Sequence, residues 1–284
     1  MIRPLVSLIS PVYQSAPYLD AFLDCVRDQT WRPLEFIIAD DGSIDRSVDI
    51  IRDRIPGLQA SGIDVTLLQL EHQGQAGAVN AALKHVAGKY LTWCDPDDYM
   101  LPECIEKKAD YLESHPDIRM VRNDGLVING DTGEILAHSA RKGDMHTQNI
   151  FDALLSETTY CYAGCYMISM ELFDLCYPDH EIPLSPEGQN LQLLLPPASR
   201  TECGYVPDVL HHYLRRASGH SSKKRSYTQA RGRILNFLTL TRRILPYCSC
   251  DQEKYTKRIE EIKDKRLEQL KYSAVLQAKE AFKK

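Results

Sequence analysis

The sequence predicts an α/β fold: a doubly wound, mostly parallel sheet that becomes mixed in its second half, followed by a C-terminal helical appendage. Strand and helix segments alternate four times in about the first hundred residues, which is typical of parallel βαβ units. Short apolar runs then flank the turn at Asp131–Gly133, a pattern that indicates antiparallel strands. Two strongly charged helical segments with apolar stripes follow residue 222.

The first half of the chain alternates buried strands with amphipathic helices. The strand at 5–10 is almost continuously apolar, as expected where both faces of a strand are covered, and a helix begins near Pro17. After the strand at 35–39, either Ser43 or Asp45 can cap the next helix. The remaining elements are a strand at 65–70, a helix that carries Val79 to Val86 and ends at Gly88, and a strand at 90–94.

The second half combines shorter strands with helices. Pro196 and Pro197 are expected to end a helix, because proline lacks the N–H group that continues the helical hydrogen bonds. The predicted helices cover 102–114, 150–155 and 187–195, and the predicted strands cover 120–121, 125–129, 135–137, part of 162–169, and 209–214.

Charge divides the chain into a main domain over 1–222 and a basic appendage over 223–284. The appendage carries 17 lysines and arginines against 7 aspartates and glutamates, a net charge of +10, whereas residues 1–222 carry a net charge of −15. Its helical faces either are solvated or attract an anionic membrane surface or a polyanionic acceptor. Its apolar stripes are expected to pack on the main domain or on another copy of the chain, as in a homodimer.

Composition favours a reduced, cytoplasmic setting, with peripheral contact at the inner membrane face as an extension of it. The nine cysteines are scattered without paired C-x-x-C spacing, which indicates free thiols and disfavours a structural zinc site. No stretch approaches the ~20 apolar residues of a membrane span, and the first residues run directly into a strand, so we expect no signal peptide. We expect no nucleic-acid partner.

The acidic turn that follows the strand at 90–94 is the strongest candidate for chemistry. Asp95 and Asp97 lie two residues apart around Pro96, so both carboxylates can face one site. Carboxylate oxygens suit Mg2+ or Mn2+, and a diphosphate can supply further ligands. The alternative is a purely structural turn that caps the helix opened by Pro102.

Two other polar turns are expected at the same edge of the sheet. They lie at Pro11, Val12 and Tyr13 and at Asp40 and Asp41, each at the carboxyl end of a predicted strand. Open α/β sheets bind their ligands beyond the carboxyl ends of their strands. The convergence of three polar turns therefore predicts a ligand site.

With these residues placed, the chain resembles glycosyltransferase family 2, whose nucleotide-sugar enzymes have the GT-A fold. The matching segments run in order over about residues 4–115. They are Leu8–Tyr13 for the first strand, Ile37–Asp45 for the second, Gly77–Ala82 for the helix before the metal motif, and Ala87–Asp98 for the D-x-D element. The resemblance makes 1–115 the nucleotide-binding half and 116–222 the acceptor half.

The resemblance also implies roles for individual residues. Pro11, Val12 and Tyr13 would line the nucleobase pocket, and Asp40 or Asp41 would contact uracil or ribose. Asp95 and Asp97 would hold the diphosphate of a nucleotide sugar through Mg2+ or Mn2+. Bare carboxylates repel a diphosphate, so an intervening cation is required.

The catalytic base is where the chain departs from the family. The family signature is Glu-Asp at the start of a helix, and the matching position here is Glu187-Gly188, so the aspartate is missing. Glu187 is the candidate base that deprotonates the acceptor hydroxyl. Its alternative role is that of a helix N-terminal carboxylate, which the helix dipole favours.

The segment Tyr213–Ser222 resembles the family's closing region near the donor. Arg216, with Arg215 or His220 as alternatives, would reach the diphosphate, because the planar guanidinium fork suits phosphate oxygens. Surface exposure is the other interpretation of these arginines. His211 and His212 alternate along a strand, so at most one faces the site, and we expect ordinary packing for both.

The resulting hypothesis is a metal-dependent, inverting glycosyltransferase. It would move a sugar from a nucleotide donor, UDP-linked, to a hydroxyl of a glycan or a lipid-linked saccharide. Two alternatives stay open. One is a nucleotide-binding module without catalysis, because Gly188 replaces the family aspartate, and the other is a nucleotidyltransferase, although the first loop lacks the glycine-rich, basic pattern of such enzymes.

Overall fold

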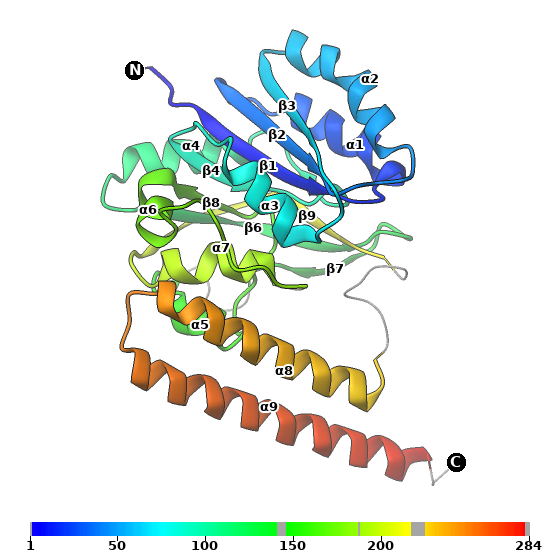
Figure 1. The fold of residues 1–284 in the computed structure, drawn as a ribbon, viewed down its shortest axis with the longest axis vertical. Helices are drawn as coiled ribbons and strands as arrows, with labels where there is room; N and C mark the ends of the chain where they lie inside the picture. The colour runs from blue at the N-terminus through cyan, green and yellow to red at the C-terminus, as the bar shows by residue number, and fades with distance from the viewer. Residues whose placement is uncertain (1, 141–145, 187, 217–224, 282–284) are drawn as a thin grey trace.

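The computed structural model describes residues 2–140, 146–186, 188–216 and 225–281. Within them the chain forms a nine-stranded sheet of order β3-β2-β1-β4-β8-β6-β9-β5, with β7 beside β6 (Figure 1). The strands are β1 (Val6–Val12), β2 (Leu34–Asp40), β3 (Ile63–Gln69), β4 (Tyr90–Trp93), β5 (Tyr99–Met100), β6 (Met120–Asn129), β7 (Ile135–His138), β8 (Tyr166–Ser169) and β9 (Cys203–Arg215).

Helices cover both faces of this sheet. Helices α1 (Ala16–Arg27), α2 (Ser47–Ala60) and α4 (Cys104–Ser114) contribute buried side chains to the core on one face. The core on the other face receives side chains from α3 (Gln75–Leu83), α5 (Phe151–Leu155), α6 (Met170–Cys176), α7 (Gln189–Ala198) and α8 (Tyr227–Ile244). This two-sided burial explains why β1 and β2 are buried along their whole lengths.

The first half of the sheet is parallel, as predicted. Strand β1 pairs in parallel with β2 on one side and β4 on the other, and β2 pairs in parallel with β3. The carboxyl ends of β1 and β2 lie in register, with Val12 opposite Asp40. The polar turns that follow these strands therefore emerge at one edge.

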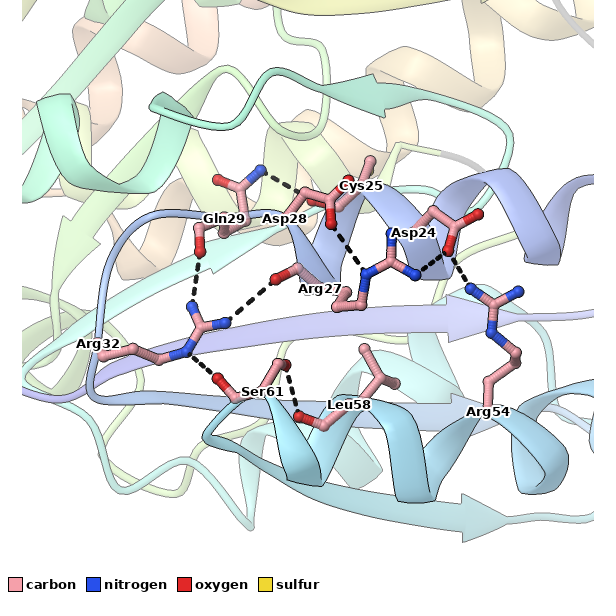
Figure 2. Close-up of polar contacts among 9 residues, drawn as sticks. All are labelled: Asp24, Cys25, Arg27, Asp28, Gln29, Arg32, Arg54, Leu58 and Ser61. Atoms are coloured by element: carbon pink, nitrogen blue, oxygen red, sulfur yellow. Dashed lines mark hydrogen bonds and ion pairs between the residues drawn. The ribbon is translucent and has the colours of Figure 1, made fainter.

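The outer layer over β1 and β2 is fastened by arginines between α1 and α2 (Figure 2). Arg54 of α2 pairs with Asp24 of α1, which also accepts a bond from Arg27 at 2.6 Å. Arg32 donates to the backbone oxygens of Ser61 at 2.9 Å and Gln29 at 2.7 Å. These contacts join α1, α2 and the loops that follow them into one layer.

The second half of the sheet is mixed. Strand β8 runs antiparallel to both β4 and β6, whereas β6 and β9 are parallel. The prediction of separate strands at 120–121 and 125–129 is wrong: β6 is one strand over Met120–Asn129, and its pairing with β9 shifts register around Asp124. The short strand β5 directly after the acidic turn was not predicted.

Helix α7 continues past Pro196 and Pro197 to Ala198, so the prediction that these prolines end the helix is wrong. A proline at position 196 cannot donate to the backbone oxygen of Gln192. The Tyr177 hydroxyl donates to that oxygen instead, at 2.9 Å, so the buried acceptor is satisfied without the helical bond.

The C-terminal helices lie side by side and antiparallel at the end of the molecule opposite α2 (Figure 1). A capping box of Ser226 and Gln229 begins α8, and the short helix η2 (Leu245–Tyr247) connects it to α9 (Gln252–Ala281). Leu240 and Ile244 of α8 are buried in the core shared with α7. The appendage therefore packs on the main domain, one of the two arrangements predicted for it.

Candidate active site

The carboxyl ends of β1, β2 and β4 bring three polar turns to one edge of the sheet. Residues 11–13 end β1, Asp40 and Asp41 end β2, and the acidic turn 95–98 follows β4. Asp41 is tied to β1 because its backbone N–H donates to Val12 O at 2.8 Å. Two of the turns are thus joined directly.

Asp41 is the centre of the corner between β1, β2 and the loop before α3. Its side chain is almost fully buried and accepts bonds from the backbone N–H groups of Gln73 at 2.8 Å and Gly74 at 2.9 Å. Its Oδ2 also lies 2.8 Å from His72 Nδ1, and the His72 ring stacks on Tyr13 with 4.3 Å between ring centroids. This corner offers a planar stack beside a fixed carboxylate.

The other residues predicted to bind the donor differ in exposure. Tyr13 is 47% exposed, whereas the Val12 side chain is fully buried in the core. Asp40 is buried as well: its Oδ2 accepts a bond from Ser43 N at 3.1 Å, and its Oδ1 has no partner among the described residues. Tyr13 can therefore present a ring to a ligand, and Asp40 holds one unsatisfied oxygen just beneath the edge.

The acidic turn presents three carboxylates in different settings. Asp95 Oδ1 accepts a bond from Gln75 Nε2 at 3.0 Å, and the Asp97 side chain is 49% exposed. Asp98 points inward, is 2% exposed, and accepts a bond from Leu214 N at 3.1 Å. The turn thus separates two outward carboxylates, Asp95 and Asp97, from one that anchors it to β9.

Burial raises the pKa values of all three carboxyl groups, and repulsion from neighbouring carboxylates adds to it for Asp95 and Asp98. Burial is the main cause for Asp95, and the charges of Asp98 and Asp97 add to it, so its pKa lies well above the usual range. Burial also raises the pKa of Asp98 well above that range and, to a smaller extent, that of Asp97. These carboxyl groups therefore resist ionisation in the absence of a counter-charge, and a bound cation would stabilise their ionised form.

A buried polar layer supports the turn from below. The Lys108 ammonium is fully buried and donates to Gly164 O at 2.5 Å, and His211 Nε2 lies 3.5 Å from Asp98 Oδ2. Burial, together with the charge of Lys108, lowers the pKa of His211 to about 3. His212 packs instead against the ring of Tyr99. His211 therefore lies beneath the turn, and the prediction of ordinary packing describes both histidines.

Arg216 lies at the acidic turn. Its Nη1 donates to Asp97 O at 3.0 Å and lies 3.9 Å from Asp97 Oδ2, while its guanidinium covers the Tyr18 ring at 4.3 Å. Glu187 and His220 lie outside the described residues. Gly188, which follows Glu187 in the chain, has a left-handed backbone with φ of 86° and caps the start of α7. A Cβ on Gly188 would lie 2.3 Å from Leu240 Cδ2, so an aspartate here would require the Leu240 side chain to shift and would strain the left-handed backbone.

Residues 7–175 match the family model described as Glycosyl transferase family 2. The chain belongs to this family. An uncharacterized glycosyltransferase of Haemophilus influenzae is 35% identical over 117 residues, which cover 40% of this chain and 45% of that protein. Chondroitin synthase of Pasteurella multocida is 34% identical over 153 residues, 54% of this chain and 15% of the synthase. The chain thus spans less than half the length of each of these two family 2 relatives.

Solved structures of glycosyltransferases share the fold. TarS 1–349 of S. aureus in complex with UDP-GlcNAc has a TM-score of 0.63 and 18% identity, over 93% of this family 2 chain and 71% of that one. The mannosyltransferase PcManGT of Pyrobaculum calidifontis, in complex with GDP-Man and Mn2+, has a TM-score of 0.62 and 18% identity. The match covers 99% of this chain and 76% of that one. These likenesses confirm the predicted GT-A fold.

Sequence reasoning missed four side chains at or below this family 2 site. The His72 ring stacks on Tyr13, and Gln75 donates to Asp95. The Tyr18 ring lies under Arg216, and Lys108 donates to the Gly164 carbonyl. His72 lies between β3 and α3, and Gln75 is the first residue of α3, so their position after a strand was a usable signal. Tyr18 and Lys108 gave no such signal, because each lies on a helix and reaches the site only through the tertiary fold.

Proposed function

We propose that the chain is a metal-dependent glycosyltransferase that takes its sugar from a nucleotide donor, and that this donor is UDP-linked. The observation that carries the proposal is the convergence at one sheet edge of the Tyr13–His72 stack, the fixed carboxylate of Asp41 and the acidic turn. A nucleoside diphosphate has the matching parts in the same order: a planar base, a ribose and a diphosphate. Family membership supports the reaction class.

The donor base would lie at the Tyr13–His72 stack. Aromatic rings stack favourably on planar bases, typically for about 1–3 kcal/mol per base. Asp41 would accept a bond from a base N–H or a ribose hydroxyl, with its carboxylate already oriented by the Gln73 and Gly74 backbone N–H groups. We assign Pro11 and Val12 to the strand end that holds Tyr13 at this place.

A divalent cation fits the acidic turn, but only together with a diphosphate. The described residues contain no group of three or more His, Cys, Asp or Glu side chains that could hold a metal. Asp95 and Asp97 would be the two protein ligands, and phosphate oxygens and water would complete the shell of Mg2+ or Mn2+. When bound, the cation would stabilise the charge that develops on the departing diphosphate.

The reaction we propose is a single displacement that inverts the anomeric carbon. A carboxylate would deprotonate the acceptor hydroxyl, and a base of this kind typically contributes about 10²–10⁴-fold to the rate. We assign this role to Glu187 because of its place before α7, whose second residue Asn190 accepts a bond from Trp93 Nε1 at 2.8 Å. That contact ties the start of α7 to the end of β4, next to the acidic turn.

The acceptor would be a hydroxyl of a glycan or of a lipid-linked saccharide. We further propose that α9 contacts an anionic membrane, where such acceptors are held. No helix among the described residues is long and apolar enough to cross a bilayer. On α9, however, Tyr272, Val275 and Leu276 occupy one helical face and are 66%, 46% and 42% exposed, next to a cationic Lys271. Exposed apolar side chains beside a cationic one would let this end of α9 contact an anionic membrane surface.

A thermal-shift panel tests the donor proposal. UDP, GDP, CDP and their common sugar derivatives would each be added with and without Mn2+, at about a hundredfold excess over Kd, where a ligand adds about 2.7 kcal/mol of stability. We expect UDP to raise the melting temperature by a few degrees only when Mn2+ is present.

The panel and one assay separate the alternatives. Silence of every nucleotide would contradict the donor site. UDP binding without release of UDP from any UDP-sugar, with water or added saccharide as acceptor, would leave a binding module in place of an enzyme.

A further inference from the structure

The side chain of Arg216 is enclosed by three separate parts of the chain. Tyr18 of α1 lies beneath its guanidinium, and the Asp97 carbonyl accepts a bond from its Nη1. Gly130, in the turn between β6 and β7, lies against its aliphatic part: a Cβ there would be 2.6 Å from Arg216 Cγ. Only 17% of the side chain remains exposed. The Arg216 side chain therefore has a fixed position, unlike a solvated surface arginine.

In this position the Arg216 guanidinium places positive charge beside the acidic turn. Arg216 Nη1 lies 3.9 Å from Asp97 Oδ2, and the guanidinium acts to lower the pKa values of both Asp97 and Asp98 against the effect of burial. The resting charge balance of the turn therefore includes a cation from the chain itself. Any further cation that binds Asp97 meets this guanidinium at short range.

We propose that Arg216 is the resting counter-ion of the acidic turn and that its guanidinium and a divalent cation exclude each other at Asp97. The inference rests on the proposed function, because it takes Asp97 as a metal ligand. Two cations at one carboxylate repel each other, and this repulsion weakens metal binding as long as the Arg216 side chain stays beside Asp97.

A nucleoside diphosphate resolves the competition. Its phosphate oxygens offer the released guanidinium a bidentate partner, which suits arginine better than a single carboxylate oxygen at 3.9 Å. The cation and the diphosphate are then expected to bind together, and the free cation alone to bind weakly. Arg216 would thus act as a positioning residue that couples metal binding to donor binding.

The test is the affinity for Mn2+ in the absence of nucleotide, measured by the loss of the free Mn2+ signal in electron paramagnetic resonance. Arg216→Gln removes the charge. Gly130→Ala keeps the charge of Arg216 but adds a Cβ that would displace the Arg216 side chain from its position beside Asp97. Both variants should bind Mn2+ about three- to tenfold more tightly than the wild type, the range expected for the loss of one partly screened charge.

The control is Arg242→Gln, which removes an exposed arginine that pairs with Glu260 on the C-terminal helices. It should leave the Mn2+ affinity unchanged. With saturating UDP present, the higher Mn2+ affinity of Arg216→Gln should disappear, because that variant also lacks the guanidinium contact to the phosphates. Gly130→Ala retains the guanidinium, so it should keep its higher Mn2+ affinity.

The outcomes distinguish this inference from the proposed function. Equal Mn2+ affinity of the wild type and both variants, with UDP and Mn2+ still binding together, would overturn the counter-ion role alone. The absence of Mn2+ binding with UDP in the wild type would overturn the metal site and this inference with it. If Gly130→Ala loses its native circular dichroism spectrum, Arg216→Gln decides the result.

Discussion

At the scale of single residues, the acidic turn lies over polar groups that are kept away from water. Lys108 and His211 are both fully buried beneath the acidic turn, and neither ring nitrogen of His211 has a hydrogen-bond partner among the described residues. A buried polar group costs free energy unless it is hydrogen-bonded, so His211 is a site of stored cost beneath the turn. The His211 ring lies next to Asp98, which joins the turn to Leu214 of β9.

Replacement of His211 should change how stability depends on pH. Its pKa is lowered from 6.5 to about 3, so between these values the unfolded chain binds a proton that the folded chain does not. The histidine therefore favours the folded state above pH 6.5, and this contribution is lost as the pH falls. Between pH 7.5 and 5, the wild type should lose ~2 kcal/mol more unfolding free energy than His211→Gln.

Urea unfolding of both proteins at the two pH values measures this difference. The comparison cancels the carboxyl groups that titrate in both proteins. Parallel losses of stability would mean that His211 is protonated in the folded state.

At the scale of elements, α7 and α8 explain the departure from the family signature. Gly188 begins α7 in a left-handed conformation, and Leu240 of α8 lies where its Cβ would be. The packing of α8 and the glycine at this position are therefore compatible with each other. Helix α8 uses this space for a buried leucine.

The coupling between these two elements can be measured with a double-mutant cycle. Gly188→Ala should destabilise the protein by about 1–3 kcal/mol, because the new Cβ overpacks the contact and favours a different backbone. In a Leu240→Ala background the added cost should be smaller, because the overpacking is relieved and only the backbone cost remains. Chemical denaturation of the four proteins gives the interaction free energy, and an additive result would show that the two side chains do not meet.

The same two scales explain how much the sequence could predict. The buried strands β1, β2 and β4 and the acidic turn could be predicted, because local apolar runs and polar ends determine them. The continuation of α7 through Pro196 could not, because it depends on a hydroxyl from Tyr177, a residue outside the helix. The partners of Arg216 were equally hidden, since Tyr18 is about two hundred positions away and reaches it only through the fold.

At the scale of the whole molecule, the proposed donor site lies at the acidic sheet edge, and the proposed membrane contact lies on the basic C-terminal helices. Anionic vesicles test the membrane proposal for α9. The wild-type chain should sediment with vesicles of phosphatidylglycerol and phosphatidylcholine but not with phosphatidylcholine alone. The double variant Tyr272→Ser, Leu276→Ser should bind about tenfold more weakly, because two exposed apolar side chains are lost.

A matched control is Leu175→Ser, which removes a leucine that is 57% exposed on α6. It should sediment like the wild type. Equal sedimentation of all three proteins would exclude this face of α9 as the membrane contact, and self-association in sedimentation velocity that the double variant abolishes would assign the face to a second copy of the chain.

The most direct test of the central claim is a calorimetric titration of UDP into the wild type and into Asp97→Asn, each with and without Mn2+. The substitution removes a metal-ligand charge at a half-exposed position, so the fold should persist. We predict that Mn2+ strengthens UDP binding by at least about tenfold, or 1.4 kcal/mol, in the wild type and by much less in Asp97→Asn. Equal enhancement by Mn2+ in both proteins would show that the cation lies elsewhere, and UDP binding that ignores Mn2+ in the wild type would contradict the metal-dependent donor site itself.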